Sequence, residues 1–282
     1  MASLDFLVVG HVTIDLLPDG STTVGGTATY AALTAKGLGC KTGLITSAGP
    51  EFDFERVVPG VQVHCIPAAR TTTFENIYDA KGARKQWIRG VAHPIRINDL
   101  SPDWATPSVV LFGPLVDEID LDVIGQFPHS LTGVTPQGWM RAWDENGYVY
   151  TRPWVGAERV LSQVDVLMFS EEDVAYDEAQ IQSYTKLARL AVVTRGANGA
   201  TVYRGKWISH YPAYQATVVD PTGAGDVFAA AFLIRLHETG DVSEAARFAN
   251  CAASFAIEGW GTSNIPTRAQ VEERLRKGAL RT

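Results

Sequence analysis

The sequence has little of several features that would point to particular classes of protein. Its three cysteines, Cys40, Cys65 and Cys251, form neither a CxxC motif nor another metal-ligand spacing, so we expect reduced thiols rather than a disulfide framework. No run approaches the roughly 20 apolar residues of a membrane span, and no N-x-S/T sequon occurs. Asp5 stands where a signal peptide would carry basic residues. These absences favour a cytoplasmic protein without membrane contact.

An excess of basic residues is also missing. The chain has 24 Lys and Arg against 31 Asp and Glu, which gives a net charge of −7. A protein that binds the phosphate backbone of a nucleic acid needs a basic face. The only dense basic cluster, Arg84, Lys85 and Arg89, is explained equally well as a solvated hairpin. We therefore expect a small-molecule substrate and no nucleic-acid partner.

Short apolar runs alternate with helical patterns along the whole chain. Buried strands separated by crossovers predict an α/β fold with a doubly wound, mostly parallel sheet and helices on both faces. Cap pairs predict late helices near 242–257 and 267–277. The expected strands and first helix are Leu4–Val9, Thr27–Leu38 (helix), Gly43–Ser47, Val109–Phe112, Val164–Phe169 and Leu190–Thr194.

One segment departs from this alternation. Thr71–Tyr78 and Gln86–Gly90 are β-like runs joined by the turn-prone Asp79–Ala83, which predicts an antiparallel hairpin off the main sheet. With no internal repeat or long linker, we expect residues 1–282 to form one domain with residues 71–90 inserted as a small lid.

The hairpin has an amphipathic face suited to a ligand the size of a sugar. Phe74, Asn76 and Tyr78 share that face by strand alternation. Asn76 offers both donors and an acceptor to hydroxyl groups, so we predict that it contacts substrate. The alternative is a static hairpin whose apolar face completes the core or a dimer contact.

The most informative segment is Asp220-Pro-Thr-Gly-Ala-Gly-Asp226, which precedes the apolar run Val227–Leu236. Glycines just before a helix let the backbone turn tightly, and the free N–H groups of the helix start suit an anion. A carboxylate at Asp226 can accept a proton from a substrate hydroxyl while these donors stabilise a phosphoryl group. The alternative is an aspartate favoured there by the helix dipole alone.

This heptapeptide resembles the C-terminal signature of the ribokinase (PfkB) family, usually D-T-x-G-A-G-D, with Pro221 in place of the threonine. Gly10-His-Val-Thr-Ile-Asp15 resembles the family's first-strand motif, whose aspartate binds substrate hydroxyls. Gly25-Gly26-Thr27-Ala28 resembles its N-terminal di-glycine signature, without the Gly-Ala-Asn that often follows.

The resemblance implies a ribokinase-like fold and ATP-dependent phosphorylation of a hydroxyl on a small polyhydroxylated substrate. It implies that Asp226 is the catalytic base beside an anion hole formed by the following residues: Gly223, Ala224 and Gly225. Asp15, Gly25 and Gly26 are then expected at the substrate.

The resemblance extends to a nucleotide side. Thr194-Arg-Gly196-Ala-Asn-Gly199 is similar to the family's strand-end loop near the nucleotide phosphates. Asn250 matches the helix beside adenine, although a buried amide with a structural role is the alternative. Gly259-Trp260-Gly261 resembles the loop that closes over the base. The resemblance thus implies ATP contacts at Thr194, Gly196, Gly199, Thr222, Asn250 and Gly259.

The expected metal site departs from the family pattern. The family carries an N-x-x-E motif after a central strand, and here Ser170 and Asp173 replace the asparagine and the glutamate. Asp173 can hold Mg²⁺ through water, because this ion usually keeps several waters, and Glu172 is the neighbouring candidate. A monovalent cation such as K⁺ is a further cofactor that the resemblance allows.

The acceptor is left open among related classes. Gln137-Gly-Trp-Met-Arg141 resembles a stretch of the inositol-kinase-like branch, although Pro136 stands where that branch has an acid. Arg141 is expected to reach substrate or phosphate, with a surface salt bridge as the alternative. A sugar, inositol or other polyol is favoured, and a nucleoside is the nearest rival. A kinase-like binding or regulatory protein without turnover, and a homodimer formed through the lid, stay open.

Overall fold

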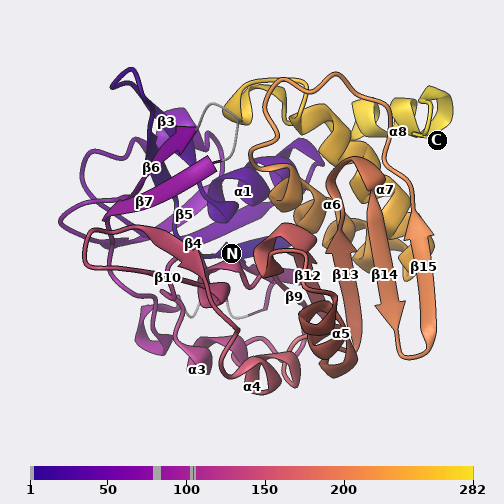
Figure 1. Ribbon diagram of the computed structural model, residues 1–282, viewed down its shortest axis with the longest axis horizontal. Helices are drawn as coiled ribbons and strands as arrows, with labels where there is room; N and C mark the ends of the chain where they lie inside the picture. Colours follow the sequence, from indigo (N-terminus) through magenta and orange to yellow (C-terminus); the bar gives the residue numbers. More distant parts are fainter. Residues whose placement is uncertain (1–2, 79–83, 102–103, 105, 282) are drawn as a thin grey trace.

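The computed structural model describes residues 3–78, 84–101, 104 and 106–281. Its centre is a nine-stranded sheet with the order β15-β14-β13-β12-β9-β8-β1-β4-β5 (Figure 1). Seven of these strands are parallel, and β14 (Ala200–Arg204) and β15 (Trp207–Tyr211) add an antiparallel edge. The parallel strands are β1 (Phe6–Val9), β4 (Thr42–Ala48), β5 (Gln62–Pro67), β8 (Val109–Phe112), β9 (Leu131–Val134), β12 (Val166–Ser170) and β13 (Leu190–Thr194). The predicted doubly wound α/β fold is confirmed.

Both faces of the sheet are covered, which explains why its strands are apolar without interruption. In β1, Phe6 and Val8 enter one core, whereas Leu7 and Val9 enter the other, as strand alternation requires. The first core includes α1 (Thr27–Gly37), α2 (Phe54–Val57), α6 (Ala224–Thr239), α7 (Val242–Ala256) and α8 (Arg268–Lys277). The second includes α3 (Leu121–Ile124), α4 (Ala157–Leu161) and α5 (Glu178–Leu187), and α3 and α4 lie at the bottom of Figure 1.

The predicted late helices are present, with the caps that the sequence indicates. Asp241 caps α7 by accepting from the backbone N–H groups of Ser243 and Glu244, and Thr267 forms a capping box with Gln270 before α8. No helix of the described residues is both long and apolar enough to cross a membrane.

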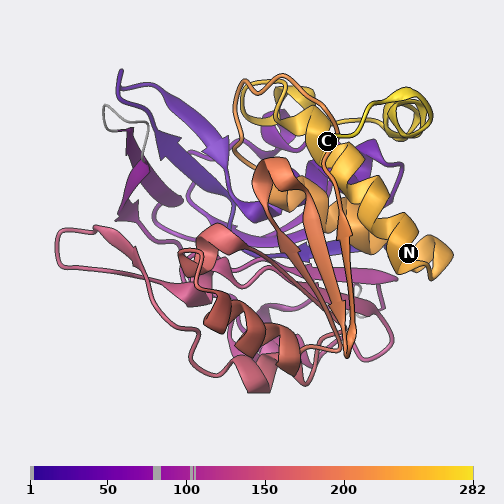
Figure 2. The same ribbon diagram turned by 45° about the vertical axis from the view of Figure 1, so that its right-hand side comes forward.

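The hairpin belongs to a second sheet of four strands, with the order β3-β2-β6-β7. These strands are β2 (Thr13–Leu16), β3 (Thr22–Gly25), β6 (Thr72–Tyr78) and β7 (Arg84–Gly90). The predicted antiparallel pairing of β6 and β7 is confirmed, and the predicted turn Asp79–Ala83 lies outside the described residues. Figure 2 shows this sheet standing off one end of the main sheet.

The small sheet also touches the rest of the molecule through side chains. Phe74 and Ile88 form a separate apolar cluster with Leu115 and Val116, which follow β8. A second hairpin, β10 (Arg141–Trp143) with β11 (Val149–Thr151), turns beside β7, where the Ile88 N–H donates to the Gly147 carbonyl at 2.8 Å. The small sheet therefore rests on two loops of the main body.

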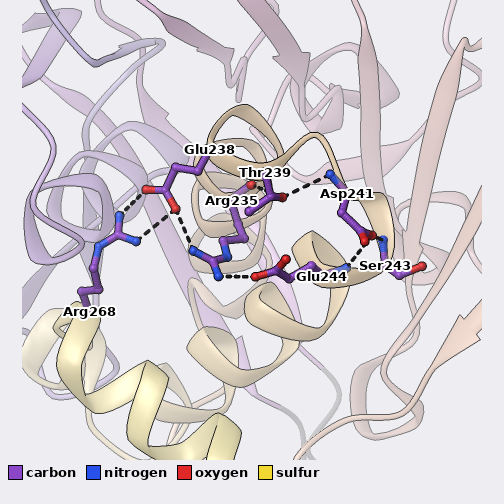
Figure 3. A network of polar contacts seen from close by, with 7 residues as sticks. All are labelled: Arg235, Glu238, Thr239, Asp241, Ser243, Glu244 and Arg268. Atoms are coloured by element: carbon purple, nitrogen blue, oxygen red, sulfur yellow. Dashed lines mark hydrogen bonds and ion pairs between the residues drawn. The ribbon is translucent and has the colours of Figure 1, made fainter.

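A charged network fixes α6 against α7 and α8 (Figure 3). Glu238 of α6 pairs with Arg235 at 3.1 Å and with Arg268 at 2.5 Å, and Arg235 also pairs with Glu244 of α7. Burial opposes ionisation of Glu238, but hydrogen bonds and charge from both arginines outweigh it and lower its pKa. The network therefore orients the helix whose other end carries the glycine loop.

The segment that leads into the glycine loop is held from the C-terminal side of the chain. Tyr214 forms an isolated antiparallel bridge with Leu280. The Gln215 N–H donates to the Ala279 carbonyl and the Arg281 N–H donates to the Ala213 carbonyl, both at 2.8 Å. This tail clip lies just upstream of Asp220.

Candidate active site

The glycine loop forms the N-terminus of α6, as the sequence predicts. Gly223 is the N-cap residue and has left-handed backbone angles, φ 78° and ψ −4°. Asp220 orders the preceding turn because its Oδ1 accepts from the Thr222 N–H at 3.0 Å. An added Cβ at Gly225 would meet no atom within 4 Å, and Gly225 is exposed. Open space therefore faces the start of a 16-residue helix, where free N–H groups and the dipole favour an anion.

Asp226 lies in the first turn of α6, beside this open space. Burial raises the pKa of its carboxyl from 3.8 to about 6, and the negative charge of Asp173 adds to the rise. A hydrogen bond from the Thr27 hydroxyl and the positive charge of Arg141 act in the opposite direction. Asp226 thus combines a raised pKa with fixed neighbours, as expected of a catalytic base.

Tyr30 of α1 fills the space behind the loop. Its ring carbons lie 2.2 Å from the position that a Cβ of Gly223 would occupy, so any side chain at residue 223 would collide with the ring. Burial raises the pKa of Tyr30, and the charges of Asp220, Asp226 and Asp15 raise it further. The Tyr30 hydroxyl therefore lies near acids of the glycine loop and near Asp15 of β2.

The predicted acceptor residues come from separate strands. Asp15 is half-buried in β2, and an added Cβ at Gly25 would lie 2.8 Å from its Oδ2. Gly26 has φ 90°, and a Cβ there would lie 2.7 Å from the His11 carbonyl oxygen. The di-glycine thus gives the Asp15 carboxylate and the turn after β1 the room that they occupy.

Asn76 and Arg141 are placed next to these strands. Asn76 is 6% exposed, and its Oδ1 accepts from Gln86 Nε2 at 2.9 Å. Phe74 is buried with it, whereas the side chain of Tyr78 lies outside the described part of the chain. Arg141 is half-buried at the start of β10 and acts electrostatically on Asp226. Its charge therefore faces the predicted catalytic centre.

The predicted nucleotide residues divide into open and packed positions. Gly196 has φ 51° and nothing within 4 Å of an added Cβ, so it borders open space at the end of β13. A Cβ at Gly199 would lie 2.1 Å from the Tyr211 carbonyl oxygen, and one at Gly259 would lie 2.6 Å from Cβ of Asn264. These two glycines are explained by packing. Thr194 is half-buried, with its hydroxyl 3.5 Å from the Phe169 carbonyl oxygen.

Asn250 has a clear structural role. It is 7% exposed, and its Nδ2 donates to the carbonyls of Tyr211 at 3.0 Å and Pro212 at 3.4 Å. These bonds favour the alternative of a buried structural amide. Asp220 also reaches this region, because its Oδ2 accepts from the Gly261 N–H at 3.0 Å. Asp220 therefore joins the glycine loop to the Gly259–Asn264 turn.

One of the two predicted metal residues, Asp173, already accepts hydrogen bonds within the protein. Asp173 Oδ1 accepts from Gln137 Nε2 at 2.8 Å, and Oδ2 accepts from the Ser170 N–H at 2.9 Å. Glu172 is exposed beside Tyr176, whose pKa it raises. Within the described ranges, no group of three or more acidic, histidine or cysteine side chains could hold a metal ion. A cation here would need oxygen ligands from water and substrate phosphate, which suits Mg²⁺.

Three residues of this site were not among the predicted site residues. Thr27 reaches Asp226, Tyr30 supports Gly223, and Gln137 holds Asp173. Thr27 directly follows the di-glycine pair, which was the one available signal for it. Tyr30 reads as an ordinary core aromatic, and its role appears only when α1 and α6 are seen side by side.

Solved structures with the same fold place the chain in a class. It superposes on Arabidopsis thaliana ribokinase complexed with ribose and ATP with a TM-score of 0.77, 20% identity and coverage of 98% of this chain and 99% of that one. A pyrophosphate-dependent myo-inositol-1 kinase, converted into a myo-inositol-3 kinase by mutation, gives a TM-score of 0.77 at 23% identity, with 95% and 97% covered. The fold is that of the ribokinase-like α/β proteins.

Sequence comparison finds similarity to carbohydrate kinases and nucleoside kinases. The family model for pfkB family carbohydrate kinases matches residues 155–268 of the chain. The cytidine kinase of Thermococcus kodakarensis is 28% identical over 286 residues, covering 93% of this chain and 99% of that protein. The ribokinase of Bacillus subtilis is 42% identical over 84 residues, 29% of each chain.

Proposed function

We propose that this protein is an ATP-dependent kinase that phosphorylates a hydroxyl of a small sugar-like substrate, with Asp226 as the general base. The observation that carries the proposal is the carboxylate of raised pKa in the first turn of α6, next to the open space at Gly225. A base next to an anion site suits transfer of a phosphoryl group between oxygens.

The reaction can be assigned to groups of this chain. Asp226 accepts the proton of the acceptor hydroxyl as its oxygen bonds to the γ-phosphorus of ATP, and the bond from that phosphorus to the bridging oxygen breaks, releasing ADP. The N–H groups of Gly223, Ala224 and Gly225 and the charge of Arg141 stabilise the negative charge on the transferring group. Asp15, Gly25, Gly26 and Asn76 hold the acceptor hydroxyls.

Mg²⁺ is the metal that the donor set suits. It would neutralise charge on the ATP phosphates, with Asp173 bound through water and Glu172 as the neighbouring alternative. The ATP contacts are proposed for Thr194, Gly196, Gly199, Thr222, Asn250 and Gly259, of which Gly196 offers open space. K⁺ as an additional cofactor and a homodimer formed through the lid belong to the same proposal.

The acceptor is proposed as a sugar, inositol or other polyol, with a nucleoside as the second candidate. Two relatives favour the nucleoside, because the similarity of each extends over almost the whole of this chain and of the relative. They are the cytidine kinase of Thermococcus kodakarensis and a nucleoside kinase of Methanothermobacter thermautotrophicus, which is 24% identical over 96% of this chain and 95% of that one. The myo-inositol kinase with the same fold favours the polyol.

A panel assay separates these candidates. Purified protein would be given ATP and Mg²⁺ with ribose, fructose, myo-inositol, cytidine or adenosine, and both ADP and phosphorylated acceptor would be measured. We expect acceptor-dependent ADP formation with one chemical class. A parallel series with pyrophosphate in place of ATP identifies the donor. Binding of acceptor and ATP without product in any combination would contradict the proposal and favour a binding or regulatory protein.

A further inference from the structure

His11 lies where the lid leaves the main body. It follows β1, and its side chain is completely buried. The imidazole Nε2 lies 2.8 Å from the His93 carbonyl oxygen, and Nδ1 lies 2.8 Å from Thr72 Oγ1. Thr72 is the first residue of β6, and His93 follows β7 closely. One ring therefore joins the β1–β2 connection to both strands of the lid hairpin at their root.

The hydrogen-bonding partners define which atoms of the ring carry hydrogen. The His93 carbonyl can only accept, so Nε2 must donate. Thr72 Oγ1 also accepts from the Ala92 N–H at 3.0 Å, so this hydroxyl joins the ring to the backbone that follows β7. The assignment of the Nε2 hydrogen follows from the chemistry of the partners. Both ring nitrogens of His11 have a hydrogen-bonding partner.

The backbone of His11 belongs to the same junction. Its N–H donates to Glu118 Oε1 at 3.0 Å, and Glu118 is 3% exposed and also accepts from the N–H groups of Leu115 and Val116 at 2.8 Å. Its carbonyl oxygen lies against Gly26 of the di-glycine turn. The turn after β1, the loop after β8, the di-glycine and the lid root thus meet at one residue.

The register of β2 and β6 connects this junction with the predicted acceptor residue Asp15. β2 pairs in parallel with β6, so that Thr13 is opposite Thr72 and Asp15 is opposite Phe74. A shift of Thr72 relative to His11 therefore displaces the strand beside Asp15. We propose that His11 is a positioning residue that couples the lid root to Asp15, so that the lid moves over an acceptor only together with that carboxylate. This inference rests on the proposed kinase function.

A matched pair of variants separates this role from ordinary core packing. Thr72→Val removes the hydroxyl that holds the ring and keeps the shape of the side chain. Thr46→Val is the control, because Thr46 is equally buried and its Oγ1 accepts from the Val12 N–H at 3.0 Å. Thr46 lies in β4, and among the described residues its hydroxyl bonds to Val12 and not to the lid hairpin. Thr72→Val removes two buried hydrogen bonds, one with the His11 ring and one from the Ala92 N–H, and Thr46→Val removes one beside the same turn.

The kinetic measurement compares the effect of each variant on the KM for acceptor with its effect on the KM for ATP. We expect Thr72→Val to raise the KM for acceptor roughly 2- to 10-fold, the range that loss of the buried hydrogen bond to the His11 ring predicts, with the KM for ATP unchanged. ATP hydrolysis without transfer should rise in the same variant. Thr46→Val should leave both KM values and the rate of ATP hydrolysis without transfer unchanged. Equal effects of the two variants would reduce His11 to a structural role and overturn the proposal.

A second readout needs no catalysis and so stays valid if the proposed function fails. Amide hydrogen exchange of residues 72–78 and 84–90 is measured in the free protein. We expect faster exchange in Thr72→Val and in His11→Asn, which loses the donor to the His93 carbonyl, and wild-type exchange there in Thr46→Val. In the double variant His11→Asn with Thr72→Val, the effects should be less than additive. Unchanged lid exchange in both single variants would overturn the coupling, whatever the activity assay gives.

Discussion

The two halves of the candidate site are built in different ways. On the phosphate side, seven consecutive residues from Asp220 to Asp226 supply the turn, the open helix end and the acid. On the acceptor side, Asp15, Asn76 and Arg141 come from β2, β6 and β10, in two different sheets. The family model matches residues 155–268, which contain the first half and none of these three residues. A site made from backbone at one helix end can be read from a short sequence, whereas a site made from side chains of distant strands cannot.

The largest expected effect tests the phosphate side. Asp226→Asn should keep the fold and ATP binding but lower kcat by roughly 10²–10⁴-fold, because it removes the proton acceptor. Asp241→Asn is a suitable control, since Asp241 caps α7 on the exposed surface. Steady-state kinetics and calorimetric ATP titration check the result. An Asp226→Asn enzyme within a few-fold of wild type would remove Asp226 from the mechanism.

The two loop glycines should respond differently to the same change. Gly223→Ala places a methyl group against the Tyr30 ring at a left-handed backbone angle, so we expect a loss of roughly 1–3 kcal/mol in the free energy of unfolding. Gly225→Ala points into open space and should keep that free energy while raising the KM for ATP. Denaturant melts and donor kinetics measure the two effects. A stable Gly223→Ala protein would contradict the packing explanation.

On the acceptor side, Asp15→Ala should raise the KM for acceptor roughly tenfold or more, because a hydrogen bond to a charged group is lost. The affinity for ATP should not change, since Asp15 lies on β2 and not on the glycine loop. Isothermal titration with each substrate separates the two affinities. Lost ATP binding with acceptor binding intact would reverse the assignment of the two halves.

The acidity of Asp226 gives the phosphate side its own pH dependence. Its pKa is raised to about 6, and the protonated form cannot accept a proton. We therefore expect kcat/KM to fall as the pH drops through about 6 and to level off above it. The folded protein holds this proton more tightly than the unfolded chain, so the contribution of Asp226 to stability decreases as the pH rises from about 4 to about 6. A flat kcat/KM profile from pH 5 to pH 8 would exclude Asp226 as the titrating base.

The smallest effect is expected for the charged network around Glu238, which lies far from both halves of the site. Glu238→Gln removes the shared acid of the α6–α8 network (Figure 3) and should cost roughly 1 kcal/mol of stability, with kcat/KM unchanged. Glu273→Gln, at the exposed pair with Lys277, should have no measurable effect on stability. Thermal melts compare the two variants. A loss of activity without a loss of stability in Glu238→Gln would mean that the network does more than hold the helices.

The same contrast explains how much could be predicted from the sequence. Val109–Phe112 and Leu190–Thr194 match their strands to the residue, because burial on both faces produces uninterrupted apolar runs. β2 and β3 were missed, since short half-buried strands at the lid have no such pattern. The roles of Tyr30 and of the His11 ring depend on pairings between segments far apart in the chain, and no local spacing encodes them.

The tail clip at Leu280 has a mechanical consequence. Because Ala279 and Arg281 are hydrogen-bonded to Gln215 and Ala213, respectively, a pull on the C-terminal end loads the segment that runs into Asp220. Force applied there would reach the glycine loop before it reaches the central strands, where β1 is held between two parallel neighbours. In a molecule held under tension, the attachment point would therefore decide whether the glycine loop is disrupted first or stays folded until the strands of the main sheet separate.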